Sequence, residues 1–515
     1  MRADKDGRSR RRRSTSGDNT LSPLSSQKPF QSLKNTNYII EPLSSEQIEA
    51  VHEASLKIIS TQGIRVLSVS ACEHLKAQGC MVDGDQMVRM DPAFVEEMIA
   101  KAPSSFTLTP RDPLKALHIG GAAMHFGLVS GPPNVHDGVR GRRPGTMEDF
   151  KDMIRLGQSF NCIHFMGNQT VATTDLPANT RHLDSMMQTL LLSDKVTSCM
   201  SIGAARVEDA SRMIAIARGM SLDAMKDDPA AITNINVNSP RVLDQEMSDA
   251  ALKLGELGQA VIITPFTLMG AMTPVTFAAA LAQQNAEALF TIALIQSAYP
   301  GARVVYGGFT SNVDMKTGAP AFGTPENSRA NMAGGQMARR YDLPYRTSAC
   351  NAANCVDAQA AYETQMALWG AITGRGNLIY HAAGWLEGGL VASFEKLVID
   401  AEMLQMMSCL LEQPDFSDDD FALEAMTDAG PGGHFFGTAH TLSRYKDAFY
   451  SPMISDWQNN ENWADAGSLT ATDRATVLWQ DILKSFVPPP IDQAVVEELE
   501  AYTAHRKEQI GTGEP

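Results

Sequence analysis

The segment Tyr380–Gly389 (YHAAGWLEGG) concentrates the side chains that are best suited to chemistry. His381 can accept, donate or carry a proton near neutral pH, and Glu387 can supply negative charge. Trp385 offers the aromatic face that binds a quaternary ammonium group best. We therefore expect His381 and Glu387 to be catalytic and Trp385 to bind substrate. The alternative is a tryptophan buried in the core beside a histidine that bonds to the backbone.

Amides and hydroxyls, with few charged groups, follow the other short apolar segments of the chain. Such a lining suits a polar, uncharged ligand, or a cation held by dipoles and aromatic rings, and it suits a phosphate poorly. Any single amide could instead cap the helix that follows it. The substrate-binding candidates are Asn168, Gln169, Asn236 and Asn351.

The sequence lacks the residue patterns of metal-dependent and of nucleophilic catalysis. Cys350 and Cys355 could hold zinc on one loop, with His381 one strand away, but no further ligand lies near them in the sequence, so we expect no metal. The chain has no GxSxG elbow and no lysine placed for a Schiff base. The sequence therefore indicates no side-chain nucleophile.

These candidates sit within a regular alternation of short apolar strands and amphipathic helices. Eight such units in one chain are typical of a closed parallel (β/α)8 barrel, a TIM barrel, and no early GxGxxG loop marks the open alternative. The barrel's reactive groups lie at the carboxyl ends of its strands. The expected strands are 123–128, 162–167, 196–202, 231–237, 260–266, 303–309, 344–349 and 377–382, and the helices are 146–158, 179–192, 206–220, 242–257, 275–298, 325–341, 356–373 and 394–412.

The chain divides into four parts by composition and pattern. Residues 1–35 are rich in Arg, Ser, Asn and Pro, which favours a disordered basic tail over a targeting signal because no apolar region follows the arginines. Residues 36–115 form an N-terminal helical and β subdomain, whose first helix follows a capping-box spacing. Residues 116–412 form the barrel domain. Residues 413–515 form a C-terminal cap.

Bulk composition limits the partners. A net charge of −16 disfavours nucleic acid, which binds basic surfaces. No apolar run reaches the roughly 18 residues of a membrane span, and seven scattered cysteines suit a reducing compartment, so we expect a cytoplasmic protein. From the large apolar helix 275–298 we expect a homo-oligomer.

Four motifs of this sequence resemble the trimethylamine:corrinoid methyltransferase family, and the resemblance runs from about residue 43 to residue 479. It implies a TIM barrel that passes a methyl group from a small methylated amine to the cobalt of a corrinoid carried by a partner protein. It also implies that the last motif, with Gly433 and His434, contacts that corrinoid. The motifs are Asp357–Glu363, Ala383–Gly389, Ser393–Glu402 and Gly430–Thr441.

One departure from the family bears on the substrate. The archaeal members carry pyrrolysine in the loop before the first motif, whereas Asn351–Cys355 holds ordinary residues. The likeness is therefore closer to the branch without pyrrolysine, which includes enzymes that demethylate glycine betaine, and we expect a quaternary amine as the substrate. Two alternatives stay open: a folate as the methyl acceptor, or a barrel that binds the amine without turnover.

Overall fold

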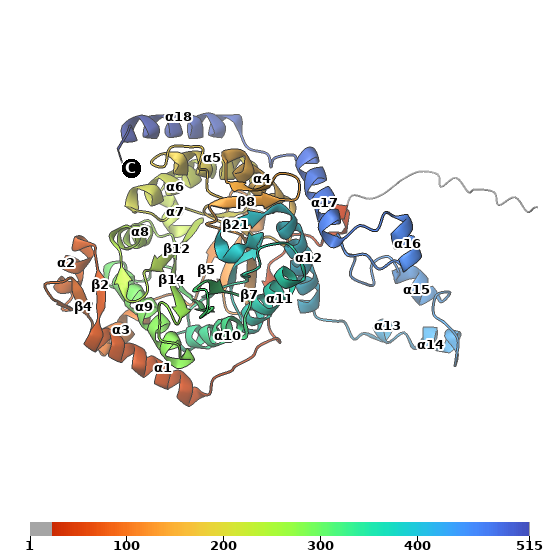
Figure 1. Ribbon diagram of the computed structural model, residues 1–515, viewed down its shortest axis with the longest axis horizontal. Helices are drawn as coiled ribbons and strands as arrows, with labels where there is room; N and C mark the ends of the chain where they lie inside the picture. The colour runs from red at the N-terminus through yellow and green to blue at the C-terminus, as the bar shows by residue number, and fades with distance from the viewer. Residues whose placement is uncertain (1–22, 514–515) are drawn as a thin grey trace, which may run out of the picture.

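A closed barrel of eight parallel strands forms the centre of the protein, and the computed structural model describes residues 23–513 (Figure 1). The ring closes because β7 pairs with both β10 and β19, while β12 pairs with both β11 and β14. The predicted TIM barrel is confirmed. Its strands are β7 (Ala123–Leu128), β10 (Phe165–Met166), β11 (Val196–Ser198), β12 (Ala231–Val237), β14 (Ala260–Met269), β15 (Val304–Gly307), β18 (Tyr345–Ser348) and β19 (Leu378–Ala383).

Eight helices surround the barrel, one after each strand, close to the expected positions. Several begin at the side-chain caps that helix starts favour, for example Thr146, Asp244 and Ser393. None of the described helices combines the length and the hydropathy needed to cross a bilayer. The surrounding helices are α4 (Met147–Ser159), α5 (Arg181–Leu192), α6 (Ala204–Ala217), α8 (Gln245–Glu256), α9 (Phe277–Ala298), α10 (Pro325–Arg340), α11 (Ala358–Thr373) and α12 (Phe394–Leu411), and the short α7 (Ala224–Asp227) precedes β12.

An antiparallel pair of strands, β5 (Ser105–Leu108) and β6 (Leu117–Gly120), packs its apolar side chains into the barrel interior. Phe106, Leu108, Leu117 and Ile119 form one cluster with inward-facing residues of the barrel strands, among them Tyr380. The interior is thus a packed core, as in other barrels of this size, and we expect a ligand to bind at the carboxyl ends of the strands.

The N-terminal subdomain packs against one side of the barrel. Ser44 caps α1 (Ser45–Lys57) in the expected capping box. The small sheet has the order β13-β2-β4-β3, and α1 and α3 contact α9. Because α9 is buried along most of its length within this chain, its apolar character is explained by intrachain packing, and the oligomeric state stays a prediction. The other elements are β2 (Ile64–Val66), α2 (Val69–Ala77), β3 (Met81–Val82), β4 (Met87–Arg89), α3 (Pro92–Ile99) and β13 (Val242–Leu243).

The segment before residue 36 differs from the expected disordered tail. Residues 1–22 lie outside the described part, but β1 (Leu33–Lys34) pairs antiparallel with β7. Asn35 is fully buried and donates to the backbone oxygens of Tyr38 and Ile372. The expectation is wrong for residues 33–35, because polar side-chain bonds and a strand pairing order a segment with little apolar surface of its own.

The C-terminal segment runs along the outside of the barrel. α17 (Ala471–Ser485) packs on α12 and α4, and α18 (Gln493–Ile510) packs on α5 and α6. The stretch with the shorter helices projects from the barrel in Figure 1. The expected capping role of residues 413–515 stays a prediction. The shorter helices are α13 (Asp418–Phe421), α14 (Leu423–Ala429), α15 (Ala439–Arg444) and α16 (Asn460–Asp465).

Candidate active site

A small sheet beside the carboxyl end of β19 carries Trp385. Its order is β20-β21-β8-β9, with β20 (Trp385–Leu386), β21 (Val391–Ser393), β8 (Asn134–Asp137) and β9 (Gly141–Pro144). β20 follows β19 directly, and β8 follows β7 after a short loop, so the sheet continues from two adjacent barrel strands. Trp385 therefore lies in a sheet that also contains the β8–β9 hairpin, with β21 between them.

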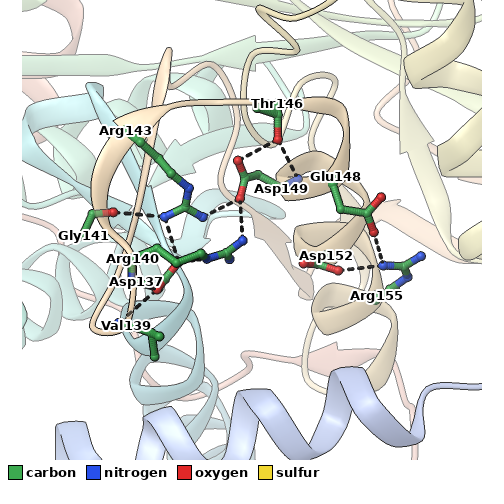
Figure 2. Close-up of polar contacts among 10 residues, drawn as sticks. All are labelled: Asp137, Val139, Arg140, Gly141, Arg143, Thr146, Glu148, Asp149, Asp152 and Arg155. Atoms are coloured by element: carbon green, nitrogen blue, oxygen red, sulfur yellow. Dashed lines mark hydrogen bonds and ion pairs between the residues drawn. The ribbon is translucent and has the colours of Figure 1, made fainter.

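Ion pairs hold that hairpin to the start of α4 (Figure 2). The buried carboxylate of Asp137 pairs with Arg140 at 2.9 Å and with Arg143 at 2.8 Å. Arg143 also pairs with Asp149, which accepts a hydrogen bond from Thr146. Although burial alone would raise it, the pKa of Asp137 lies below its ordinary value because the Arg140 backbone N–H and two guanidinium groups stabilise the carboxylate.

Glu387 takes part in the same scaffold. Both of its carboxylate oxygens accept hydrogen bonds from Nε of Arg142, at 3.0 and 3.1 Å. Its backbone N–H donates to the oxygen of Ala353. These contacts join the β8–β9 hairpin to the turn after Trp385, and the expected catalytic role of Glu387 stays a prediction.

His381 is buried at the end of β19 with its backbone in the left-handed region, at φ 55°. The strand register is irregular between Ile379 and Ala383, so the alternation of side chains breaks there. Nδ1 lies 3.3 Å from the backbone N of Ser130, and Nε2 lies 3.3 Å from Nη2 of Arg346. Burial and the Arg346 charge hold the pKa of His381 well below its ordinary value, so the imidazole is neutral at pH 7.

Arg346, in β18, was not among the residues expected from the sequence. Its side chain is 1% exposed, and no Asp or Glu of residues 23–513 pairs with it. The guanidinium lies over the rings of Phe309 and Tyr380, 5.1 and 4.9 Å from their centroids. Burial lowers the pKa of Arg346 to about 10, which still leaves it charged at neutral pH. The site thus holds a buried positive charge to which residues 23–513 supply no counterion.

Aromatic rings surround His381 and Arg346. The ring of His381 lies 4.3 Å from that of Trp385 and 5.8 Å from that of Phe309. Phe322 meets Trp385 edge-on at 6.2 Å, and Phe309 stacks on Phe322 at 5.3 Å. Phe309 begins β16 (Phe309–Val313), and Phe322 follows β17 (Pro320–Ala321). Their negative faces form surroundings that stabilise an organic cation.

Two of the four predicted amides lie beside this cluster. Asn168 accepts a hydrogen bond from Oγ of Ser130, whose backbone N–H faces His381. The backbone oxygen of Gln169 accepts from Gly131, and its side-chain Nε2 is buried without a hydrogen-bond acceptor among the described residues. His381, Trp385 and Asn168 are therefore brought together, as their strand-end positions indicated.

The other two amides are placed differently. Asn351 is fully buried, and its Nδ2 donates to the backbone oxygen of Trp385 at 2.6 Å. Asn351 therefore contacts the backbone of Trp385. Asn236 is exposed near the end of β12, and it makes no side-chain hydrogen bond to a described residue. Contact of these amides with substrate stays a prediction.

The remaining expected positions lie elsewhere. Gly433 and His434 are exposed between α14 and α15, in the stretch that projects from the barrel in Figure 1. Cys350 is buried, whereas Cys355 is exposed and its thiol donates to Asp357. Within residues 23–513, no three His, Cys, Asp or Glu side chains are grouped so that they could hold a metal ion. The absence of a metal stays a prediction.

Comparison with known proteins identifies the family. The model of the trimethylamine methyltransferase (MTTB) family matches residues 5–511. A glycine betaine methyltransferase of Desulfitobacterium hafniense is 33% identical over 470 residues, which cover 91% of this chain and 98% of the relative. A trimethylamine methyltransferase of the same species is 25% identical over 471 residues, covering 91% and 94% of the two chains.

A solved structure shares the fold. The monomethylamine methyltransferase of Methanosarcina barkeri superposes with a TM-score of 0.51, covering 91% of this chain and 90% of its own at 9% sequence identity. That likeness supports the barrel alone. The family model and the 33% identical relative both span nearly the whole chain. The chain therefore belongs to the trimethylamine methyltransferase (MTTB) family.

Proposed function

We propose that this protein transfers a methyl group from a small quaternary amine that also carries a carboxylate, a betaine, to the cobalt of a corrinoid held by a partner protein. The observation that carries the substrate assignment is that an aromatic cluster lies beside the Arg346 guanidinium, with which no carboxylate of the described residues pairs. A zwitterion has one group for each.

The donors around His381 support an anionic group at this position. A backbone N–H can only donate, so the contact from Ser130 requires Nδ1 to accept. In the neutral imidazole the proton then lies on Nε2, and this N–H points toward Nη2 of Arg346, which is also a donor. Two donors therefore converge without an acceptor between them, and Nε of Arg346 has no acceptor among the described residues either. A carboxylate would accept from these groups.

The aromatic rings suit the opposite end of such a substrate. Trp385 and Phe309, whose centroids lie 6.3 Å apart, can face the methyl groups of an ammonium. A quaternary amine without a carboxylate would bring a second positive charge toward Arg346, which costs free energy in a buried site. The site therefore favours a betaine over tetramethylammonium or choline.

The main task of the protein in this reaction is to orient the methyl donor. When the methyl group leaves a quaternary amine, the C–N electron pair stays on nitrogen, so the product is a neutral tertiary amine and no proton is needed. The reduced corrinoid supplies the electron pair of the new bond to carbon. The chain's own residues bind the donor, align one methyl group and exclude water. Such a reaction needs no side-chain nucleophile, and the sequence indicates none.

A spectroscopic assay tests the proposal. The protein is mixed with cob(I)alamin, free or on a corrinoid protein, and with one amine at a time, and the absorbance of the reduced corrinoid is followed. We expect loss of the cob(I) spectrum with glycine betaine and none with trimethylamine. Turnover with trimethylamine and with no quaternary amine would refute the substrate assignment. Turnover only with a folate acceptor would refute the corrinoid assignment.

A further inference from the structure

We propose that Thr364, Lys396 and Asp400 are positioning residues that fix the orientation of the Trp385 indole through a closed ring of buried polar contacts. The inference deepens the proposed function and rests on it for its kinetic consequences. The ring of contacts itself is independent of what the substrate is. Among the described residues, no hydrogen bond or cation–π contact joins these three residues to the rings of His381, Phe309 or Phe322, so we expect them to act through Trp385.

Asn351 holds Trp385 at two points. Its Nδ2 donates to the backbone oxygen of Trp385 at 2.6 Å, and its own backbone oxygen accepts from Nε1 of the indole at 3.1 Å. The first contact fixes the main chain and the second fixes the side chain. Rotation of the indole would break the second bond and leave a buried N–H without an acceptor.

Thr364, in α11, connects Asn351 with a charged pair. Its Oγ1 accepts from Nδ2 of Asn351 at 3.2 Å and from Nζ of Lys396 at 2.9 Å. Oγ1 has two lone pairs, and both are used. Lys396 lies in α12, so this hydroxyl joins two neighbouring helices of the barrel at the level of the Trp385 segment.

The charged pair returns the ring to Trp385. Nζ of Lys396 pairs with Oδ1 of Asp400, one helical turn further along α12. The other oxygen of Asp400 accepts from the backbone N of Gly384 at 2.8 Å. Gly384 directly precedes Trp385, so the contacts close a ring that holds the tryptophan from both sides. Gly384 has a φ of 93°, a conformation that favours glycine and lets the chain turn from β19 into β20.

The cost of burying these groups points to a role other than stability. Lys396 and Asp400 are each 1% exposed, and Asp400 is the one carboxylate of residues 23–513 that pairs with Lys396. A buried ion pair is often no more stabilising than apolar residues of the same volume, and specifying one geometry is a role that such pairs have in some proteins. Here the geometry specified is that of the indole, which lies 4.3 Å from His381 at an interplanar angle of 48°.

A matched pair of variants tests the ring. Thr364→Val keeps the shape of the side chain and removes the acceptor, whereas Thr364→Ser keeps the hydroxyl. Lys195→Met is the control, because Lys195 is also a buried lysine but donates to the oxygens of Gly157 and Phe160, at the start of β11. The full-length proteins are labelled with 5-fluorotryptophan, and the ¹⁹F resonance of Trp385 is assigned with Trp385→Phe.

We expect a single sharp Trp385 resonance in the wild type, in Thr364→Ser and in Lys195→Met, and a broadened or split one in Thr364→Val. With glycine betaine, kcat of Thr364→Val should fall about 10-fold and KM should change less than about 3-fold, because misaligned groups impair the reaction more than binding. The double variant Lys396→Met/Asp400→Leu should show the same signature, and it serves if Thr364→Val does not fold.

An unchanged Trp385 resonance in folded Thr364→Val and in the double variant would overturn the inference. So would a loss of activity in Thr364→Ser equal to that in Thr364→Val. If the wild type transfers methyl groups from no quaternary amine, the proposed function fails, but the resonance still reports on the ring. The two failures are thereby distinguishable.

Discussion

Replacing Arg346 with methionine removes the guanidinium and leaves a side chain that fills apolar space. The substitution is informative because Arg346 is 1% exposed and no carboxylate of the described residues pairs with it. If the charge serves substrate binding, its removal should weaken betaine binding strongly. If the charge serves the fold, its removal should instead destabilise the free protein.

The magnitudes separate these two outcomes. Truncating one member of a buried, hydrogen-bonded charge pair costs about 2 to 5 kcal/mol, so the Kd for glycine betaine should rise about 30- to 5000-fold. In the free protein, burying an unpaired guanidinium costs several kcal/mol, while its two cation–π contacts each return up to about 2 kcal/mol. These terms nearly cancel, so the free energy of unfolding should change by less than about 2 kcal/mol.

Isothermal titration with glycine betaine and urea unfolding without ligand measure the two quantities. Tetramethylammonium is the control ligand, because it offers the cation without the carboxylate. Its binding should be unchanged or stronger in Arg346→Met, since a buried positive charge has been removed. Unchanged betaine affinity would refute the assignment of Arg346. A loss of betaine affinity matched by an equal loss of tetramethylammonium affinity would also refute it.

Three further predictions follow from the same geometry. Trp385→Ala should weaken binding of glycine betaine by about 1 to 2 kcal/mol if the ring is a desolvated cation–π partner. Equal affinities of the variant and the wild type for glycine betaine in a titration would contradict this. Burial lowers the pKa of His125 to about 4 from 6.5; below pH 6.5 the unfolded chain binds a proton that the folded chain does not, so stability falls as the pH falls toward 4. At about pH 5 this group should lower the free energy of unfolding by about 2 kcal/mol relative to pH 7.5. Urea unfolding of His125→Asn should lack that part of the pH dependence. An identical pH dependence in the variant and the wild type would count against the prediction. Deletion of residues 1–35 should lower the melting temperature because it removes β1 and the buried bonds of Asn35. Deletion of residues 1–22 is the control, because it leaves these contacts in place. Equal melting temperatures of the two truncated proteins in differential scanning fluorimetry would show that the contacts contribute little.

The sequence predicts the fold well because periodicity is a property of the chain itself. Most barrel strands are short and largely apolar, and most outer helices have an apolar face, so alternation and length identify them. Residues 33–35 were misjudged because their order comes from partners distant in sequence. Leu33 pairs with Met124 in β7, and Asn35 bonds to Ile372. No local pattern reports such contacts.

The sequence predicts the site only in part, because the site also depends on contacts between residues that are distant in sequence. Strand ends indicated His381, Trp385 and Asn168, and these lie together. Arg346 was overlooked, although a charged residue inside the otherwise uncharged strand Tyr345–Ser348 of a closed barrel is itself a signal of function. The inward position of His381 could not be predicted, because it depends on a break in alternation that the backbone makes at a positive φ.

A crystal structure of the protein with glycine betaine would test the central claim most directly. We expect the carboxylate to accept hydrogen bonds from the Arg346 guanidinium and from Nε2 of His381, and the ammonium methyl groups to lie against the rings of Trp385 and Phe309. One methyl group should point out of the barrel toward solvent, where a corrinoid can approach. Betaine bound away from Arg346, or bound with its ammonium end nearest the guanidinium, would contradict the account.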